Sequence, residues 1–256
     1  MHANDAHKNA QNHIKERGNV IIIILVIIAL LAALTAISMR SSNRTSDNID
    51  TETARVQAEK LMRQAKSLET AVQSAMTVGH CSENDLSFEN TETTRDYTNS
   101  NTPTDNHCKL FDMAGAGLGY FTPDSSSLDS SLSARTDYGQ WIIKGTQCIL
   151  GVGSDADDSC SNNEVALIYA VPHINLAVCL QVNNLNEITN PSGAPPQEDF
   201  DNSVTPFTGG FTAATDPEIG EGATGVELKT HATGCLQTTS GTWTNSYIFY
   251  HVLYAR

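Results

Sequence analysis

Two histidine–cysteine pairs, His80-Cys81 and His107-Cys108, have the ligand types of a zinc site built from two Cys and two His. Adjacent residues of an extended chain point to opposite sides, so both members of a pair can hardly reach one metal ion. The competing interpretation is a disulfide between Cys81 and Cys108, with the two histidines exposed beside it. We expect this disulfide and no metal at these residues.

The chain has six cysteines, and all of them follow an apolar segment at residues 20–37. An even number of cysteines confined to one side of such a segment is typical of an oxidising compartment, which predicts three disulfides. The sequence alone does not fix their connectivity. Closeness along the chain favours Cys81 with Cys108, Cys148 with Cys160, and Cys179 with Cys235.

Three aspartates, Asp155, Asp157 and Asp158, lie in a Gly- and Ser-containing loop between Cys148 and Cys160. Calcium takes about six to eight oxygen ligands, and this loop could supply about four of them from carboxylates and carbonyls. The spacing is not that of an EF-hand. The loop is therefore a weak calcium candidate, with a solvated acidic turn as the alternative, and we expect no other cofactor.

No set of nucleophile, base and orienting residue stands out in the sequence. Ser154 lies in a glycine-containing turn, but a nucleophile elbow needs glycines where this chain has Val152 and Ala156. The run from Gly115 to Gly119 lacks the spacing of a dinucleotide turn, because Tyr120 stands where the third glycine would be required. We therefore expect that the protein is not an enzyme.

The parts of the chain that come first are a polar stretch, residues 1–18, and the apolar segment, which is interrupted only by Thr35. As a helix, residues 20–37 would span roughly 27 Å, close to the thickness of a bilayer core. We expect a cleavable leader at 1–18 and a transmembrane helix at 19–39. The alternative is a secretory signal with Ala36-Ile37-Ser38 as its cleavage site.

A second helical pattern follows, and Asp50 or Thr51 could cap its first backbone N–H groups. Charged residues lie opposite an apolar stripe, so we expect residues 40–78 to continue the helix and to pack on a sheet or on other helices. A coiled-coil seam is the alternative, but alanine at most positions makes it narrow. The stripe consists of Ala54, Ala58, Leu61, Ala65, Leu68, Val72 and Ala75.

Residues 79–256 have the composition of a β-rich head, with short apolar runs between Ser, Thr, Asn, Asp and Gly. A helical spacing after Pro172 predicts a short helix at 174–188. Pro and Gly residues at 189–222 predict a long irregular loop. The expected strands are residues 86–89, 140–144, 147–152, 164–171, 234–238 and 247–254.

Charge is distributed unevenly along the chain. Residues 1–76 carry 9 Lys or Arg against 7 Asp or Glu, whereas residues 77–256 carry 6 against 22, a net charge of −16. A surface this acidic repels phosphate groups, so we expect no nucleic-acid partner.

The order of these parts resembles the type IV pilin and type II secretion pseudopilin superfamily. The resemblance implies an α+β fold, in which a long N-terminal helix with a transmembrane half and an amphipathic half packs on a disulfide-bonded, mainly antiparallel β head. It also implies cleavage between Gly18 and Asn19 by a prepilin peptidase. The protein would then be a single-pass inner-membrane protein with its head in the periplasm, able to join a filament.

Two residues depart from the pattern of that superfamily. Asn19 stands where an aromatic residue or Met is usual, and Ile23 stands where an acidic residue is usual, fifth after the cut. The acidic residue is thought to pair with the N-terminal amine of a neighbouring subunit, because an unpaired charge in lipid is costly. Its absence favours a minor or tip-proximal subunit. The implied partners are other pilin-like subunits, the peptidase and the inner-membrane assembly machinery.

A looser resemblance covers most of the head and is to uncharacterised pilin-like proteins of Gram-negative bacteria, especially alphaproteobacteria. The segments that carry it are SENDLSFEN, DNHCKLFD, VPHINLAVCLQVNN and YIFYHVLYAR. A rival interpretation is a signal-anchored periplasmic binding or sensing protein, with the loop at 189–222 as its recognition surface.

Overall fold

The computed structural model describes Ile24, Ile28 and residues 50–256, with the exception of 157–158, 202, 204 and 215–217. The chain divides into two compact units, Met1–Glu52 and Thr53–Arg256. Nearly all described residues belong to the second unit, and the elements below lie in it. The predicted cleavage position at Gly18 and Asn19 lies outside the described residues.

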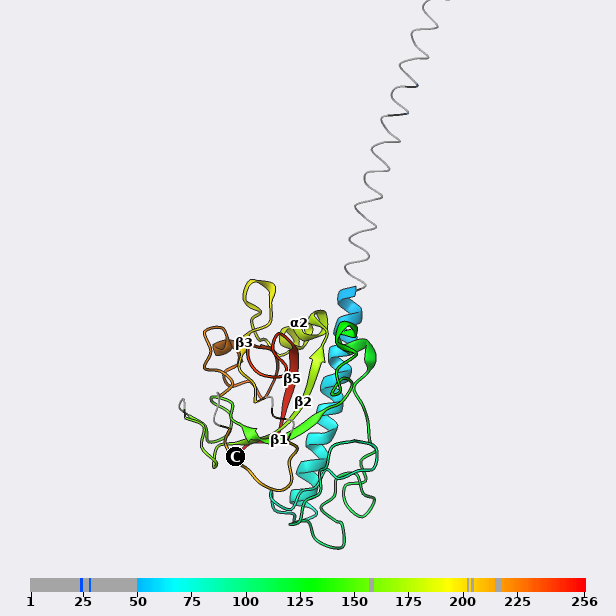
Figure 1. The fold of residues 1–256 in the computed structure, drawn as a ribbon, viewed down its shortest axis with the longest axis vertical. Helices are drawn as coiled ribbons and strands as arrows, with labels where there is room; N and C mark the ends of the chain where they lie inside the picture. Colours follow the sequence, from blue (N-terminus) through cyan, green and yellow to red (C-terminus); the bar gives the residue numbers. More distant parts are fainter. Residues whose placement is uncertain are drawn as a thin grey trace, which may run out of the picture. The chain divides into compact units, whose positions relative to one another are not determined.

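A five-stranded mixed sheet forms the centre of the second unit (Figure 1). The strands lie in the order β1-β2-β5-β4-β3. Neighbouring strands are antiparallel, except for β3 and β4, which run parallel. The strands are β1 (Ile142–Gln147), β2 (Ala166–Ile174), β3 (Gln197–Glu198), β4 (Thr233–Thr238) and β5 (Tyr247–Tyr254).

Both faces of this sheet are buried. Successive residues of a strand point to opposite faces, and in β2 Ile168 and Tyr169 accordingly join two different apolar clusters. In β5, Phe249 and Tyr250 divide in the same way. Because apolar neighbours cover both faces, β2 and β5 have nearly continuous apolar sequences instead of an alternating pattern.

Residues 50–77 are helical, and from Ala54 onward the helix packs along one face of the sheet (Figure 1). All seven residues of the predicted apolar stripe are buried, and they join the same cluster as Tyr169 and Phe249. Alanine is small and favours helix, so its repetition in the stripe lets the helix approach the sheet closely. A polar contact adds to this packing, because Nε2 of His251 in β5 lies 2.9 Å from Oε2 of Glu69.

The helix ends just before the first disulfide. The backbone N–H of Gly79 donates to the carbonyl of Ser74 at 3.1 Å, and His80 takes a left-handed φ of 57°. A Cβ at Gly79 would lie 2.5 Å from the carbonyl oxygen of Ala75. Only glycine fits at this position, which explains why the helical pattern stops there.

The second helix, α2 (Leu176–Leu185), packs beside the first one in the same apolar cluster. The side chain of Asn175 caps it by accepting the N–H of Ala177 at 2.8 Å. It is shorter than the expected 174–188, because Glu187 has a φ of 60° and cannot continue a helix. Four 3-10 helices complete the described elements: η1 (Ser125–Ser127), η2 (Ser130–Leu132), η3 (Pro191–Gly193) and η4 (Gly225–Leu228).

Several strands differ from their predicted bounds. The segment 86–89 makes only a bridge, between Ser87 and Lys109. The segment expected at 140–144 corresponds to β1, whose ladder becomes irregular between Lys144 and Gln147. The segment expected at 147–152 is not a strand beyond Gln147 and makes an isolated bridge at Ile149. The expected loop at 189–222 contains η3 and the short parallel strand β3.

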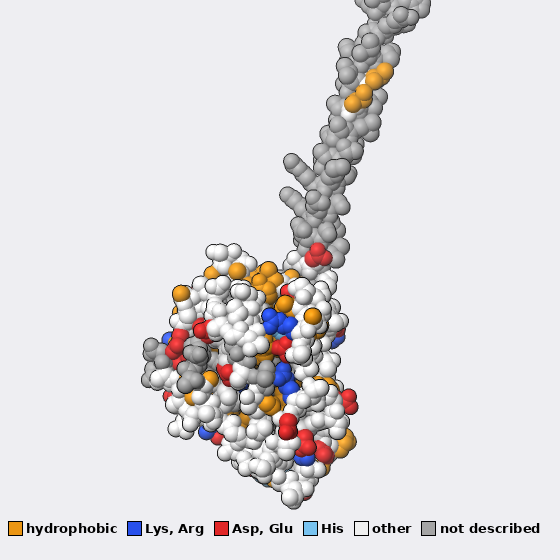
Figure 2. Space-filling model, in the orientation of Figure 1, with side chains coloured by type: hydrophobic (Ala, Val, Ile, Leu, Met, Phe, Trp, Pro, Cys, Tyr) orange, Lys and Arg blue, Asp and Glu red, His pale blue; other side chains and the backbone are white. Residues whose placement is uncertain are grey.

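On the face shown in Figure 2, uncharged polar surface predominates and acidic side chains are scattered across it.

The expected fold class is wrong in the parts that concern the first helix and the sheet. Within the described part of the chain, no helix is long and apolar enough to cross a membrane. The helix at 50–77 is amphipathic, with charged residues such as Arg55 and Lys66 exposed on its outer face. The sheet is mixed, since β3 pairs in parallel with β4.

This finding also corrects the expected localisation. Placement as a single-pass inner-membrane protein with a periplasmic head depended on a transmembrane helix at 19–39. The structure does not provide such a helix among the residues that it describes. The single-pass placement is therefore not supported.

Candidate functional site

A buried hydrogen-bond chain in the head has the connectivity of a serine-hydrolase triad. Oγ of Ser246 lies 2.7 Å from Nδ1 of His173, and Nε2 of His173 lies 3.0 Å from Oδ1 of Asp137. The indole N–H of Trp243 donates to the other carboxylate oxygen of Asp137. In the serine-protease triad, Nε2 of the histidine takes the serine proton while the carboxylate holds Nδ1, so the two ring nitrogens are exchanged here.

Local backbone geometry places these side chains. His173 has a φ of 64° and lies in a bulge of β2, where the pairing with β5 shifts between Val171 and Ile174. Pro172 is tolerated in the strand because a bulge needs no ladder hydrogen bond from it. No signal in the sequence predicts this set, because the three residues come from distant segments and form no recognised motif.

Burial decides what the chain of hydrogen bonds can do. His173 is fully buried and Ser246 is 1% exposed, so an external substrate has no route to the serine oxygen. Burial opposes ionisation of Asp137, but the hydrogen bonds from His173 and Trp243 hold its pKa below the usual value. The ionised carboxylate therefore fastens β2 and the segment before β5 to the loop that carries Asp137.

A buried ion pair fastens the long loop in a similar way. Nζ of Lys144 in β1 lies 2.5 Å from Oδ2 of Asp201, and the Lys144 side chain is fully buried. Burial lowers the pKa of Lys144 to about 8, against the attraction of Asp201. The hydroxyl of Thr146 donates to the same carboxylate oxygen at 2.6 Å. Part of the loop at 189–222, which the rival interpretation makes a recognition surface, is thus tied to the sheet.

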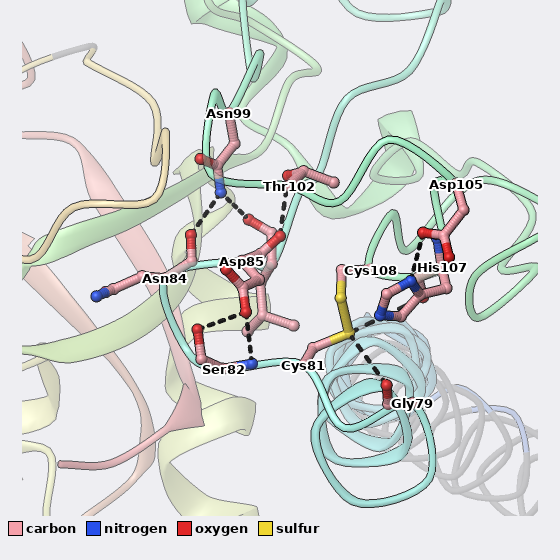
Figure 3. Close-up of a disulfide and its surroundings, with 11 residues drawn as sticks. Gly79, Cys81, Ser82, Asn84, Asp85, Asn99, Thr102, Asp105, His107 and Cys108 are labelled. Carbon is pink, nitrogen blue, oxygen red and sulfur yellow. Dashed lines mark hydrogen bonds and ion pairs between the residues drawn. A yellow bond between two sulfur atoms is a disulfide. The ribbon is translucent and has the colours of Figure 1, made fainter.

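Cys81 and Cys108 form a disulfide, shown in Figure 3. Both sulfur atoms and a ring nitrogen of His107 lie within 4.8 Å of one another. However, sulfur atoms joined in a disulfide are not thiolates and cannot serve as zinc ligands. Nδ1 of His107 instead pairs with Oδ1 of Asp105 at 2.5 Å, and His80 is exposed.

Two further disulfides are present, Cys148–Cys160 and Cys179–Cys235. Together with Cys81–Cys108 they are the nearest-neighbour pairs that the sequence favours. Cys148–Cys160 closes the acidic loop, and Cys179–Cys235 joins α2 to β4. Each disulfide therefore holds a connection to the sheet or to the helix at 50–77.

The acidic loop brings Asp155 against a residue far along the chain, Glu218. A parallel bridge between Ile149 and Ile219 aligns the two segments, and the N–H of Leu150 donates to the carbonyl of Ile219 at 2.9 Å. Both carboxyl groups are 2% exposed. Burial, the carboxyl of Asp155 and, to a smaller extent, the carboxyl of Glu221 raise the pKa of Glu218 to about 9.

Two buried carboxyl groups this close can share a proton or hold a cation. The calcium interpretation is only partly met by the described residues. They include no group of three acidic ligands within 4.8 Å of one another at this place, and Asp157 and Asp158 lie outside the described residues. A shared proton is the state that fits the residues present.

The two remaining motifs of the sequence lie in turns and loops of the head. Ser154 is exposed, and its N–H donates to the carbonyl of Arg256 at 2.5 Å. The glycine run from Gly115 to Gly119 lies in a surface loop. Comparison with protein-family models, curated proteins and solved structures finds no match to this chain. A function must therefore be argued from the residues themselves.

Proposed function

We propose that this chain is a structural, pilin-like subunit of a type IV pilus or a type II secretion-type filament, in a minor or tip-proximal position. The observation that carries the proposal is the helix at 50–77, which follows the apolar segment and is packed along a disulfide-bonded head. A head anchored on such a helix can be joined to a fibre through the helix alone. The buried hydrogen bonds and the buried ion pair join distant segments of the head, which suits a structural role.

Packing between subunits would use the apolar segment at residues 20–37 and the outer face of the helix. That outer face carries Arg55 and Lys66, and Val56 is 55% exposed on it. Ile23 in place of an acidic residue favours a subunit at the end of the fibre. The partners would be other pilin-like subunits and a prepilin peptidase.

Site-specific photo-crosslinking tests this proposal. A benzophenone amino acid replaces Val56, and a matched control replaces Val226, which is 54% exposed and lies in η4. In cells that make the protein, we expect adducts with other filament subunits from position 56 and fewer from position 226. The absence of any filament-subunit adduct from position 56, with normal expression, would contradict the proposal.

A further inference from the structure

A groove opens on the surface of the head between the segments at 89–92 and 109–120. Its volume is about 520 Å³. Its base is fixed, because the N–H of Ser87 donates to the carbonyl of Cys108 and the N–H of Leu110 donates to the carbonyl of Ser87. The Cys81–Cys108 disulfide ties the same segment to the end of the helix at 50–77. The groove is therefore preformed, as small-ligand sites usually are.

Two glycines of the run noted in the sequence, Gly117 and Gly119, line one wall, and Gly115 closes the turn that carries them. A Cβ at Gly115 would lie 2.0 Å from the carbonyl oxygen of Lys109, so this turn closes only on glycine. Gly117 has a φ of 63°, and a Cβ at Gly119 would meet no heavy atom within 4 Å. The first two glycines set the turn, and the third leaves the groove open.

The floor is aromatic. The rings of Phe111 and Tyr120 lie edge to face with centroids 5.8 Å apart, and Phe111 stacks on the buried ring of Trp141 at 5.8 Å. The two floor rings are half-buried, so packing from below holds them in place. Aromatic faces held in this way attract alkylammonium and guanidinium groups.

The groove is lined by three carboxylates and one cation, Lys109. Nζ of Lys109 is already paired with Oε2 of Glu89 at 2.7 Å. Asp112 accepts the N–H of Ala114 at 2.8 Å and faces the groove from its own turn. Glu92 is exposed at the rim, and no ion pair of its carboxylate occurs among the described residues. The residues that line the groove keep a net negative charge after this ion pair is formed, although the charge of Arg95, which is not among them, also acts on Tyr120.

Met113 stands on the rim with 88% of its surface exposed. A thioether side chain adapts to irregular apolar partners, so Met113 can cover an apolar group at the rim. The combination of an aromatic floor, unpaired carboxylates and an exposed methionine matches a cationic ligand that also has an apolar part.

We propose that this groove binds a peptide segment in which an Arg or Lys side chain lies beside an apolar residue. The cation would lie over Phe111 and Tyr120 with Glu92 and Asp112 beside it, while the apolar neighbour covers Met113. This inference does not depend on assembly of the chain into a filament.

The test measures binding of acetyl-Leu-Arg-amide to the full chain by isothermal titration. The control peptide carries citrulline in place of arginine, which keeps the shape and removes the charge. We expect saturable binding of the arginine peptide and at least about tenfold weaker binding of the citrulline peptide. No saturable binding, or equal affinity for the two peptides, would overturn the proposal.

Two glycine variants locate the site. Gly119→Trp fills the groove, and Gly210→Trp is its matched control, because both glycines are exposed, have no positive φ and leave open space around a Cβ. Circular dichroism establishes that both variants fold. The arginine peptide should bind the Gly210→Trp variant as it binds the unchanged chain, and the Gly119→Trp variant should lose binding. Unchanged affinity in a folded Gly119→Trp variant would show that the peptide binds elsewhere and would refute the assignment.

Discussion

Single buried polar residues join segments of the head that are far apart in the sequence. Asp137 holds His173 and Trp243, and Lys144 holds Asp201. Removing one partner of such a group leaves the other without a hydrogen bond in a place that water does not reach. The stability of the head should therefore depend strongly on a few polar side chains.

Asp137→Ala tests how much the buried hydrogen bonds of Asp137 contribute to the stability of the head. The change leaves the His173 and Trp243 ring N–H groups buried without their acceptor, at a cost of about 1–3 kcal/mol for each group. Ser246→Ala leaves only Nδ1 of His173 without its partner and should cost about 1–3 kcal/mol for this single group, about half the cost of Asp137→Ala. Urea unfolding of the two variants measures both values. Equal losses in the free energy of unfolding of the two variants would mean that the Asp137 carboxylate contributes no more than the Ser246 hydroxyl.

Glu218→Gln tests the buried carboxyl pair through its pH dependence. The pKa of Glu218 is about 9 in the folded chain and near 4.5 when unfolded, so the folded state holds an extra proton between these pH values. Its stabilising contribution is complete below the lower value and is lost as the pH rises through the higher one. The variant should lose this decline in urea unfolding between pH 5 and pH 8. The exposed Glu187→Gln is the control and should keep the decline; the same decline in Glu218→Gln would contradict the assignment.

At the scale of elements, the helix at 50–77 depends on the small size of its buried face. Ala65→Leu inserts three extra carbons where the alanine is fully buried, so the helix must move away from the sheet. We expect a loss of about 1–3 kcal/mol in the free energy of unfolding. Val56→Leu, at an exposed position of the same helix, should change it by less than about 0.5 kcal/mol. A tolerated Ala65→Leu would show that the helix is only loosely packed.

The sequence predicts well those elements whose apolar residues repeat regularly or whose last turn is marked by a terminating residue such as glycine. The alternating spacing from Ala54 to Ala75 gives the buried face, and Gly79 gives the end of the helix. β5 occupies its expected residues because an uninterrupted apolar run leaves little choice of bounds. β2 passes through Pro172 by means of a bulge, which depends on tertiary contacts and has no local signal.

The sites are harder to predict than the elements, because they join distant segments. Nothing in the sequence links Asp155 to Glu218, and the pair forms only once the segments of Ile149 and Ile219 lie side by side. The same is true of Asp137, His173 and Ser246. The transmembrane helix expected at 19–39 is not supported, because no helix among the described residues is long and apolar enough to cross a membrane.

For the whole molecule, the structure describes a head whose rigidity comes from three disulfides, two apolar clusters and a few buried polar clasps. Such a cross-linked head suits a protein that presents a fixed binding surface, and it suits less well a protein that works by changing its conformation. The proposed filament role and the proposed peptide groove use different parts of it. The first uses the outer face of the helix, and the second uses the loops at 89–120.

The measurement that tests the central proposal most directly is the mass of the N-terminal peptide of the protein isolated from cells that make it. A pilin-like subunit should begin at Asn19, with or without an N-methyl group, because cleavage after Gly18 precedes assembly. A chain that begins at Met1 or His2, or at Met39, would contradict the proposal.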